Sequence, residues 1–158
     1  MRCLIGLILC LMLQVSYAKE SLPKDCSHLK DVTEADFVLL SKKEFIELGE
    51  CLAISLIKKR APLNVVESCS EVDEDRRNIL GIFSLSKLEA ILIGQCVGTI
   101  NYIYQHYDNE PVSSYSYRRS KTNKYQCTKG IQAVDILRRS TAKSYTRTKL
   151  RDLLCSVR

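Results

Sequence analysis

The chain is poor in the residues and spacings on which most active sites and metal sites depend. Its 158 residues include two histidines, His28 and His106, which lie far apart in the sequence. It contains no Cys-x-x-Cys pair, no His-Glu-x-x-His segment and no phosphate-binding glycine motif. Few options remain for a Ser/His/Asp or Cys/His catalytic site, and zinc-ligand spacing is missing. We therefore predict a protein that is not an enzyme and that binds no metal and no cofactor.

Long apolar runs are scarce. One occurs at residues 3–13, after the positively charged Arg2 and before small residues that end at Ala18. This pattern is typical of a secretory signal peptide cleaved after Ala18, and the run is too short to span a bilayer. No second stretch reaches the ~18 apolar residues of a transmembrane helix. The sequence predicts a signal peptide at 1–18, no transmembrane segment and a secreted, extracellular domain at 19–158.

Cysteine, in contrast, is present in a number that suggests disulfide bonds. Removal of the signal peptide would leave six: Cys26, Cys51, Cys69, Cys96, Cys127 and Cys155. An even count in a secreted chain predicts a disulfide framework. The remaining chain of about 140 residues is long enough to bury a hydrophobic core. We expect the disulfides to reinforce that core.

A fragment of the chain occurs twice, at residues 40–51 and 85–96. The two copies share leucine, serine, lysine, glutamate, isoleucine, glycine and cysteine at equivalent positions. Each contains a Ser-x-x-Glu capping box, in which the serine hydroxyl accepts from the N–H three residues on and the glutamate accepts from the serine N–H. An internal repeat indicates a copied supersecondary unit. We predict helices at about 42–59 and 87–107.

Apolar residues recur at steps of three and four in both expected helices, which predicts one buried face on each. The predicted buried residues are Phe45, Leu48, Cys51, Leu52 and Leu56 in the first helix and Ile91, Leu92, Cys96, Ile100 and Ile103 in the second. Gly49 and Gly94 each stand two residues before the helix cysteine, where glycine lowers helix propensity. We expect them to allow a close crossing with another backbone.

The six cysteines form three successive pairs along the chain. We predict three tandem helical units at about 26–60, 69–107 and 127–155, with a loop at 108–126. Each unit would contain a first cysteine, a short helix and a helix that carries the second cysteine. Modular copying favours one disulfide within each unit, although bonds between units remain an alternative. Strict apolar alternation is rare, so we expect no strands and an all-α, disulfide-stapled helical domain.

In the third unit, the short helix is expected within 131–145. Its predicted apolar face comprises Ile131, Val134, Leu137, Thr141 and Tyr145.

Charge is divided unequally along the chain. Residues 19–110 carry 11 Lys/Arg and 16 Asp/Glu, whereas residues 111–158 carry 12 Lys/Arg and 2 Asp/Glu. In one interpretation, the basic last third packs beside the acidic part and the charges balance. In the other, it forms a surface for an anionic partner, such as a sulfated glycan or an anionic lipid. Nucleic acid is the least favoured anion.

The loop at 108–126 combines tyrosines with basic residues. The predicted binding residues are Tyr115, Tyr117, Arg118, Arg119, Lys121 and Lys124. Tyrosine supplies large contact area at low entropic cost, and arginine pairs with anions. A solvated linker is the alternative, since polar loops commonly only connect elements. Just before the loop, Tyr102, Tyr104 and Tyr107 are expected either to complete the core or to line a pocket.

These features predict a secreted, non-enzymatic interaction protein (an effector, inhibitor or ligand). Its expected partner is an extracellular protein or an anionic component of the cell surface or matrix. One alternative is an extracellular carrier of a small hydrophobic ligand in a helical cavity. Another is a helical cytokine-like ligand. In a single bundle the two capped helices would share one core, whereas stacked units would keep their disulfides internal.

Overall fold

The computed structural model describes residue 26 and residues 39–77, 85–112, 123–141 and 145–158. The signal-peptide pattern lies outside these residues. The described part is mostly helical, as predicted. Its helices are α3 (Lys42–Lys58), α4 (Val65–Arg77), α5 (Lys87–Tyr107), α6 (Gly130–Arg138) and α7 (Arg147–Leu154), and its strands are β1 (Tyr125–Cys127) and β2 (Cys155–Val157). None of the described helices is both long and apolar enough to cross a bilayer.

Both capping boxes form, and they start α3 and α5 at the predicted residues. The backbone N–H of Ser41 donates to the Glu44 carboxylate over 2.7 Å, and the Glu44 N–H donates to the Ser41 hydroxyl over 3.3 Å. The corresponding distances for Ser86 and Glu89 are 2.6 and 3.2 Å. These reciprocal bonds satisfy backbone donors that have no partner within the helix.

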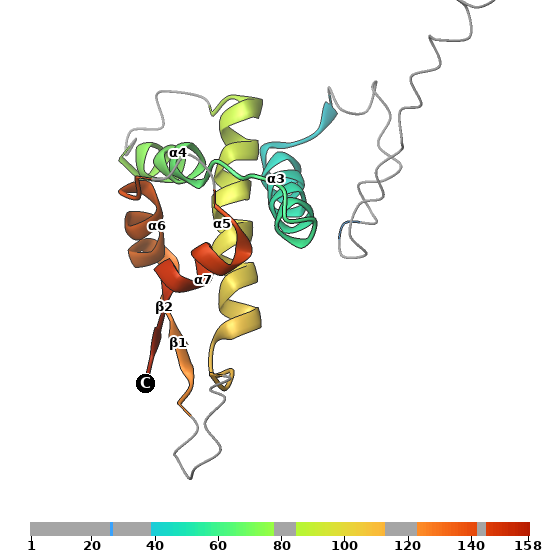
Figure 1. The fold of residues 1–158 in the computed structure, drawn as a ribbon. Helices are drawn as coiled ribbons and strands as arrows, with labels where there is room; N and C mark the ends of the chain where they lie inside the picture. Colours follow the sequence, from blue (N-terminus) through green and yellow to red (C-terminus); the bar gives the residue numbers. More distant parts are fainter. Residues whose placement is uncertain (1–25, 27–38, 78–84, 113–122, 142–144) are drawn as a thin grey trace, which may run out of the picture.

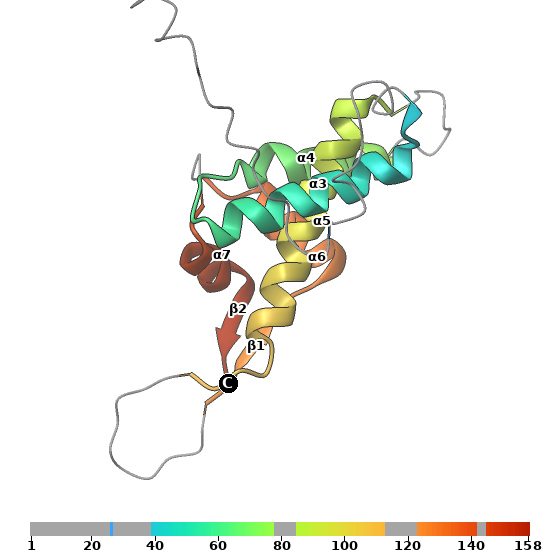
Figure 2. The same ribbon diagram turned by 90° about the vertical axis from the view of Figure 1, so that its right-hand side faces the viewer.

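The long helix α5 is central, and α3 crosses it closely (Figures 1 and 2). A Cβ atom on Gly49 would lie 2.9 Å from the Gly94 Cα and nearer still to the Ile91 carbonyl oxygen. A Cβ atom on Gly94 would lie 2.9 Å from the Gly49 Cα and nearer still to the Ile46 carbonyl oxygen. The predicted close crossing is therefore confirmed. The reciprocal contacts join equivalent positions of the repeat, so the two copies pack against each other with approximate local two-fold symmetry.

The buried faces of α3 and α5 differ in part from the prediction. Leu48, Leu52, Leu56, Ile91 and Leu92 are only half-buried. Small residues occupy much of the buried surface instead, including Gly49 and Ala53 on α3 and Ala90, Gly94 and Gly98 on α5. Because the glycines allow the two backbones to approach closely, small residues form much of the contact between α3 and α5. A pattern of large apolar residues could not show this.

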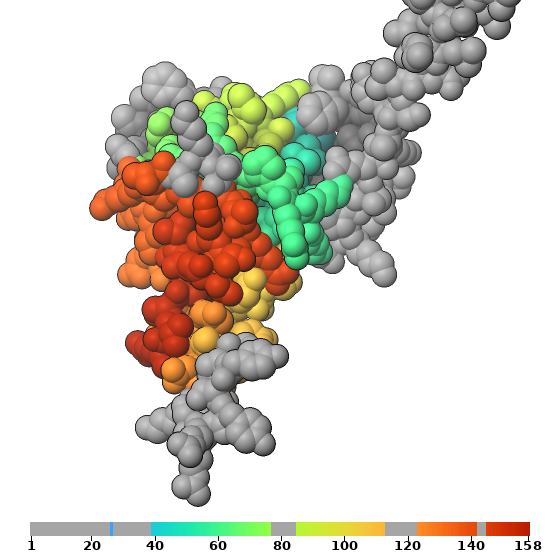
Figure 3. Space-filling model, viewed as in Figure 1, coloured from blue at the N-terminus to red at the C-terminus, as the bar shows by residue number. Residues whose placement is uncertain are grey.

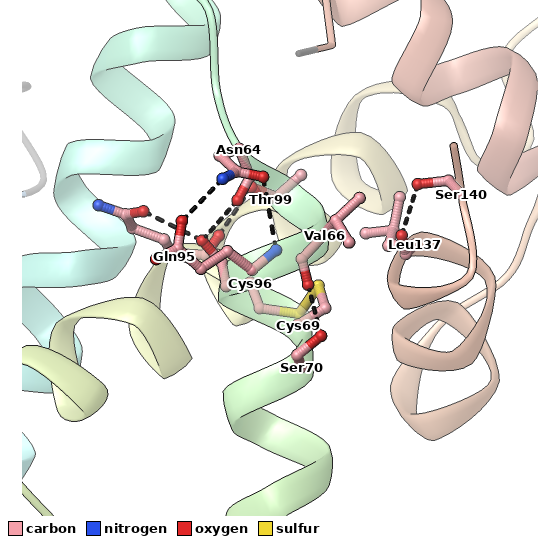
Figure 4. The surroundings of a disulfide bond; sticks show 11 residues. Asn64, Val66, Cys69, Ser70, Gln95, Cys96, Thr99, Leu137 and Ser140 are labelled. Carbon is pink, nitrogen blue, oxygen red and sulfur yellow. Dashed lines mark hydrogen bonds between the residues drawn. A yellow bond between two sulfur atoms is a disulfide. The ribbon is translucent and has the colours of Figure 1, made fainter. Parts of the chain in front are cut away.

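The disulfides pair Cys26 with Cys51, Cys69 with Cys96, and Cys127 with Cys155. This is the pairing favoured by modular copying, and no bond joins two predicted units. Figure 4 shows the second disulfide, which links α4 to α5. Two nearby hydroxyls donate within their own helices, Thr99 to the Gln95 carbonyl over 2.7 Å and Ser70 to the Val66 carbonyl over 2.8 Å. The Ser68 hydroxyl donates across the two helices to the Gln95 side-chain oxygen over 3.1 Å.

The third unit differs from the first two. Cys127 ends β1 and Cys155 begins β2, and the strands pair antiparallel with these two residues opposite each other. The expectation of no strands is therefore wrong for this short ladder, since three-residue strands are too brief for an alternation pattern. The fold remains mostly helical, and the finer picture of three equivalent units is not confirmed.

The short helix expected within 131–145 is α6, which ends at Arg138. Val134 and Leu137 are buried as predicted, and Tyr145 is buried beyond the helix end. Ile131 and Thr141 are exposed, contrary to the prediction.

All five described helices contribute to one core. It contains Ala53 and Ile57 of α3, Val65 of α4, Ile103 of α5, Leu137 of α6 and Leu150 of α7. The two capped helices thus pack together as in a bundle, while the disulfides stay within the units as in a stack. The shared core is the arrangement expected of a single bundle, and a stack of three units is not confirmed.

Candidate functional site

The C-terminal half of α5 presents tyrosines in different directions because successive residues of a helix point to different sides. Tyr102 is buried in the core, whereas Tyr104 and Tyr107 are half-buried. Tyr107 lines one surface cavity and Tyr104 lines another. Both roles considered for these tyrosines are therefore present.

Two arginines of α7 lie over tyrosine rings. The Arg147 guanidinium carbon is 5.4 Å from the centre of the Tyr102 ring and 5.2 Å from that of Tyr107. The Arg151 guanidinium carbon is 5.6 Å from the Tyr107 ring centre and 5.2 Å from that of Tyr125 in β1. These distances are within the range of cation–π attraction. We call this alternating series of Tyr102, Arg147, Tyr107, Arg151 and Tyr125 the tyrosine–arginine ladder.

The two arginines of the ladder have different polar partners. Arg151 donates to the Asp152 carboxylate, and this hydrogen bond raises the pKa of Arg151. Arg147 has no carboxylate partner among the described residues, and its Nε–H is buried without a hydrogen-bond acceptor there. Arg147 is thus held by aromatic rings and keeps most of its donors free.

A cavity of about 550 Å³ lies between the end of α3 and the start of α7. We call it the α3–α7 cavity; Figure 3 shows the two segments side by side, α3 ending in green and α7 in red. Its lining residues are Ile57, Lys58, Arg60, Tyr107, Thr146, Arg147 and Thr148. Three of them are cationic and none is acidic.

The end of α3 places Arg60 in an unusual conformation. The Ala61 N–H donates to the Leu56 carbonyl over 2.9 Å, and Arg60 has a φ of 58°. This is a Schellman ending, in which glycine normally occupies the left-handed position. A side chain there costs about 1 kcal/mol. An arginine therefore lies beside the cavity at a position where a glycine would make the protein more stable.

A second cavity, of about 600 Å³, lies beside β1, and we call it the β1 cavity. Its cationic lining residues are Lys124, Lys129 and Arg158, all exposed. The Lys129 ammonium lies 4.8 Å from the centre of the Tyr104 ring. Asp108 is the acidic lining residue, and its carboxylate accepts from the Cys127 N–H over 2.9 Å. That carboxylate thus holds β1 against the end of α5.

The predicted binding residues are only partly located. Tyr115, Tyr117, Arg118, Arg119 and Lys121 lie outside the described residues, whereas Lys124 is exposed and lines the β1 cavity. Two segments within the predicted loop at 108–126 lie against each other: the Val112 N–H donates to the Asn123 carbonyl over 2.8 Å, and Pro111 forms an isolated bridge with Lys124.

Glutamates gather on α4, and burial together with the neighbouring carboxylates raises the pKa of Glu71. Among the described residues, the basic last third is ion-paired to the earlier acidic part through Arg138, which lies 2.9 Å from the buried Asp73. Asp73 also pairs with Arg76 on its own helix at 3.1 Å. The ion pair between Asp73 and Arg138 joins α4 to α6. It does not involve the cations that line the α3–α7 cavity or the β1 cavity.

His106 is engaged in local contacts. Its ring stacks on Tyr102 with centroids 3.9 Å apart, and its Nδ1 lies 2.9 Å from the Tyr102 carbonyl oxygen. His28 lies outside the described residues. The six paired cysteines have no free thiols.

Sequence reasoning missed the α3–α7 cavity and the ladder. The run Lys58-Lys59-Arg60 before Pro62 is visible in the sequence as a cationic helix end. Nothing in the sequence pairs this run with Arg147, which lies far along the chain, so only the packing of α7 on α5 reveals the cluster.

Neither a protein-family model nor a curated protein nor a solved structure matches the chain. The functional argument therefore depends on the residues and geometry described above.

Proposed function

We propose that this chain is a secreted, non-enzymatic interaction protein that binds a sulfated glycan of the cell surface or matrix. The observation that carries the proposal is the β1 cavity, where Lys124, Lys129 and Arg158 are exposed side by side. Lysine and arginine bind sulfate groups through charge-assisted hydrogen bonds. Arg151 of α7 lies over the ring of Tyr125, which lines this cavity, and extends the cationic surface onto α7.

The disulfides support both an extracellular location of the protein and a rigid binding surface. Such bonds form in oxidising compartments, and the pattern at residues 1–18 is that of a secretory signal. The bond between Cys127 and Cys155 ties together the two strands beside the β1 cavity. A fixed arrangement of cations loses less entropy when it binds a charged polymer.

The predicted loop belongs to the same proposed surface. Two of its residues, Val112 and Asn123, are hydrogen-bonded to each other, and Asn123 is next to Lys124 in the chain. We propose that the loop residues add contacts to a glycan bound at the β1 cavity. These residues are Tyr115, Tyr117, Arg118, Arg119 and Lys121.

The alternatives have less support. A carrier of a neutral apolar ligand needs a mainly apolar cavity, whereas both cavities described here have charged and polar linings. A cytokine-like ligand is compatible with a shared helical core but explains neither cavity. We retain tandem copying as the proposed origin of the first two units, because their repeated helices pack on each other symmetrically.

Heparin affinity as a function of salt tests the proposal. The disulfide-bonded protein should bind at low salt and be released as salt rises, because exposed charges are screened. The variant K124Q/K129Q/R158Q should elute at clearly lower salt. The control K42Q/R139Q/K149Q removes the same net charge from exposed residues outside both cavities. Heparin from which the sulfate groups have been removed should not bind the parent protein or either variant.

A second variant, R118Q/R119Q/K121Q, tests the loop. A shift similar to that of the β1 cavity variant would support a surface that includes both. Absence of heparin binding at low salt would refute the glycan proposal. Equal shifts for the control and cavity variants would refute the assignment to the β1 cavity, since net charge alone would then explain the binding.

A further inference from the structure

The α3–α7 cavity brings three cationic side chains together, with no counter-charge from the part of the chain that the structure describes. Lys58 and Arg60 come from the end of α3, and Arg147 comes from the start of α7. Among the described residues, no acidic side chain lines the cavity and no carboxylate forms an ion pair with any of the three. Three like charges around one hollow repel one another, and an anion placed among them would relieve that repulsion.

The start of α7 adds to the positive potential. An α-helix has a partial positive charge at its N-terminus, where acidic residues are stabilising. The first turn of α7 has no acidic residue and instead begins with Arg147 and Thr148, which line the cavity. Its cap, Thr146, also lines the cavity and accepts from the Lys149 N–H over 3.4 Å. The helix end and the three cations therefore act in the same direction.

Arg147 is positioned in advance for this role. Its guanidinium lies over the rings of both Tyr102 and Tyr107, and these two contacts restrict its orientation. A planar guanidinium presents several donors that match sulfate, phosphate and carboxylate oxygens. Because it has no carboxylate partner among the described residues, those donors are available to a ligand.

The cavity also has apolar walls. Ile57 is 2% exposed and belongs to the core, and the Tyr107 ring is half-buried. A volume of about 550 Å³ lies within the range of small-molecule sites, roughly 300–1,000 Å³. A bare inorganic ion would leave most of this space and both apolar walls uncovered.

We propose that the α3–α7 cavity binds a small organic anion. Its sulfate, sulfonate, phosphate or carboxylate group lies among Lys58, Arg60 and Arg147, and its apolar body packs on Ile57 and Tyr107. This site is separate from the glycan surface and does not depend on it. A free metabolite and the headgroup of a lipid both supply this chemistry.

A matched pair of fluorescent probes tests the proposal. The probe 8-anilino-1-naphthalenesulfonate carries a sulfonate on an aromatic body, and N-phenyl-1-naphthylamine has the same body without the charge. The folded, disulfide-bonded protein should bind the sulfonate with about one-to-one stoichiometry. It should bind the neutral analogue at least about tenfold more weakly, a difference of about 1.4 kcal/mol. Equal affinity for the two probes would overturn the proposal.

Arg60→Gly separates loss of the site from loss of the fold. Glycine relieves the left-handed conformation, so Tm should rise by about 2–4 °C. Affinity for the sulfonate probe should nevertheless fall about five- to tenfold, and Lys58→Gln should have a similar effect. The control K42Q/R139Q/K149Q should bind as the parent does. Unchanged affinity in both cavity variants would refute the site.

Two further measurements identify the ligand source and keep the two proposals apart. If the apolar walls contribute to binding, excess inorganic sulfate should displace the probe only weakly. Full displacement by sulfate at low concentration would refute the proposal that the ligand has an apolar body. Vesicles with anionic lipid should compete if the anion is a headgroup, whereas soluble carboxylates and sulfates with apolar tails should compete if it is a free molecule. The K124Q/K129Q/R158Q variant should retain probe binding even where heparin binding is lost.

Discussion

The closest backbone contact described here makes Gly49→Ala a stringent test of the fold. In an isolated helix this change is favourable by about 1 kcal/mol, because alanine has the higher helix propensity. In this protein the new Cβ would lie 2.9 Å from the Gly94 Cα and nearer still to the Ile91 carbonyl oxygen. Carbon atoms prefer separations of about 3.5–4.0 Å. The two helices would have to separate, which would disturb the packing between them.

The magnitude follows from these opposing effects. Overpacking a core costs about 1–3 kcal/mol and occasionally more. Here the obstructing atoms belong to the backbone of a long central helix, so we expect the upper part of that range or beyond it. After the propensity gain, the net destabilisation should be about 1–3 kcal/mol, with a Tm lower by about 3–10 °C.

Thermal and urea denaturation of the disulfide-bonded protein, followed by circular dichroism, measure this effect. Gln105→Ala is a suitable control because Gln105 is exposed on α5, and it should leave the Tm almost unchanged. Gly94→Ala should resemble Gly49→Ala because the contacts are reciprocal. The double variant should lose less than the sum, since the first substitution already separates the helices. A Gly49→Ala protein as stable as the parent would refute the close crossing.

Three further outcomes are expected. Asp73→Asn should destabilise the protein by about 2 kcal/mol in urea denaturation, because Arg138 loses its buried partner but keeps its ion pair with Asp135; a loss below about 0.5 kcal/mol would show that the buried pair is not formed. Burial and neighbouring glutamates raise the pKa of Glu71, so the charged carboxylate opposes folding at neutral pH. This destabilisation disappears as the pH falls through the raised pKa toward the ordinary value of 4.5. Glu71→Gln should therefore raise Tm at pH 7 by an amount equivalent to about 0.5 kcal/mol, and by less at pH 4.5; a gain that grows in acid would contradict this reasoning. Limited reduction should open the Cys127–Cys155 bond before the disulfide between α4 and α5, because Cys155 is partly exposed and both cysteines of the other bond are fully buried; peptide mapping of the alkylated protein would show the reverse order if access does not control the reaction.

Much of the local structure could be predicted from residue spacing. The Ser-x-x-Glu motifs located the starts of α3 and α5, because a capping box involves residues only three positions apart. Gly49 and Gly94 indicated a close crossing, since glycine in a helix interior is otherwise unfavourable. Modular copying favoured the sequential pairing of the cysteines, and the disulfides of the structure have this pairing. The binding residues predicted in the loop at 108–126 remain predictions, apart from the location of Lys124 beside the β1 cavity.

By itself, the sequence determined the mostly helical class, the helix starts and the favoured disulfide pairing, because these depend on interactions over a few residues or on the symmetry of a copied fragment. Only the tertiary structure decided that the two repeated helices cross at their glycines and that small residues occupy their contact. It also brought Arg147 beside Lys58 and Arg60, from opposite parts of the chain, and paired β1 with β2. Such contacts result from the simultaneous packing of several helices around one core, and no short-range spacing in the chain encodes them.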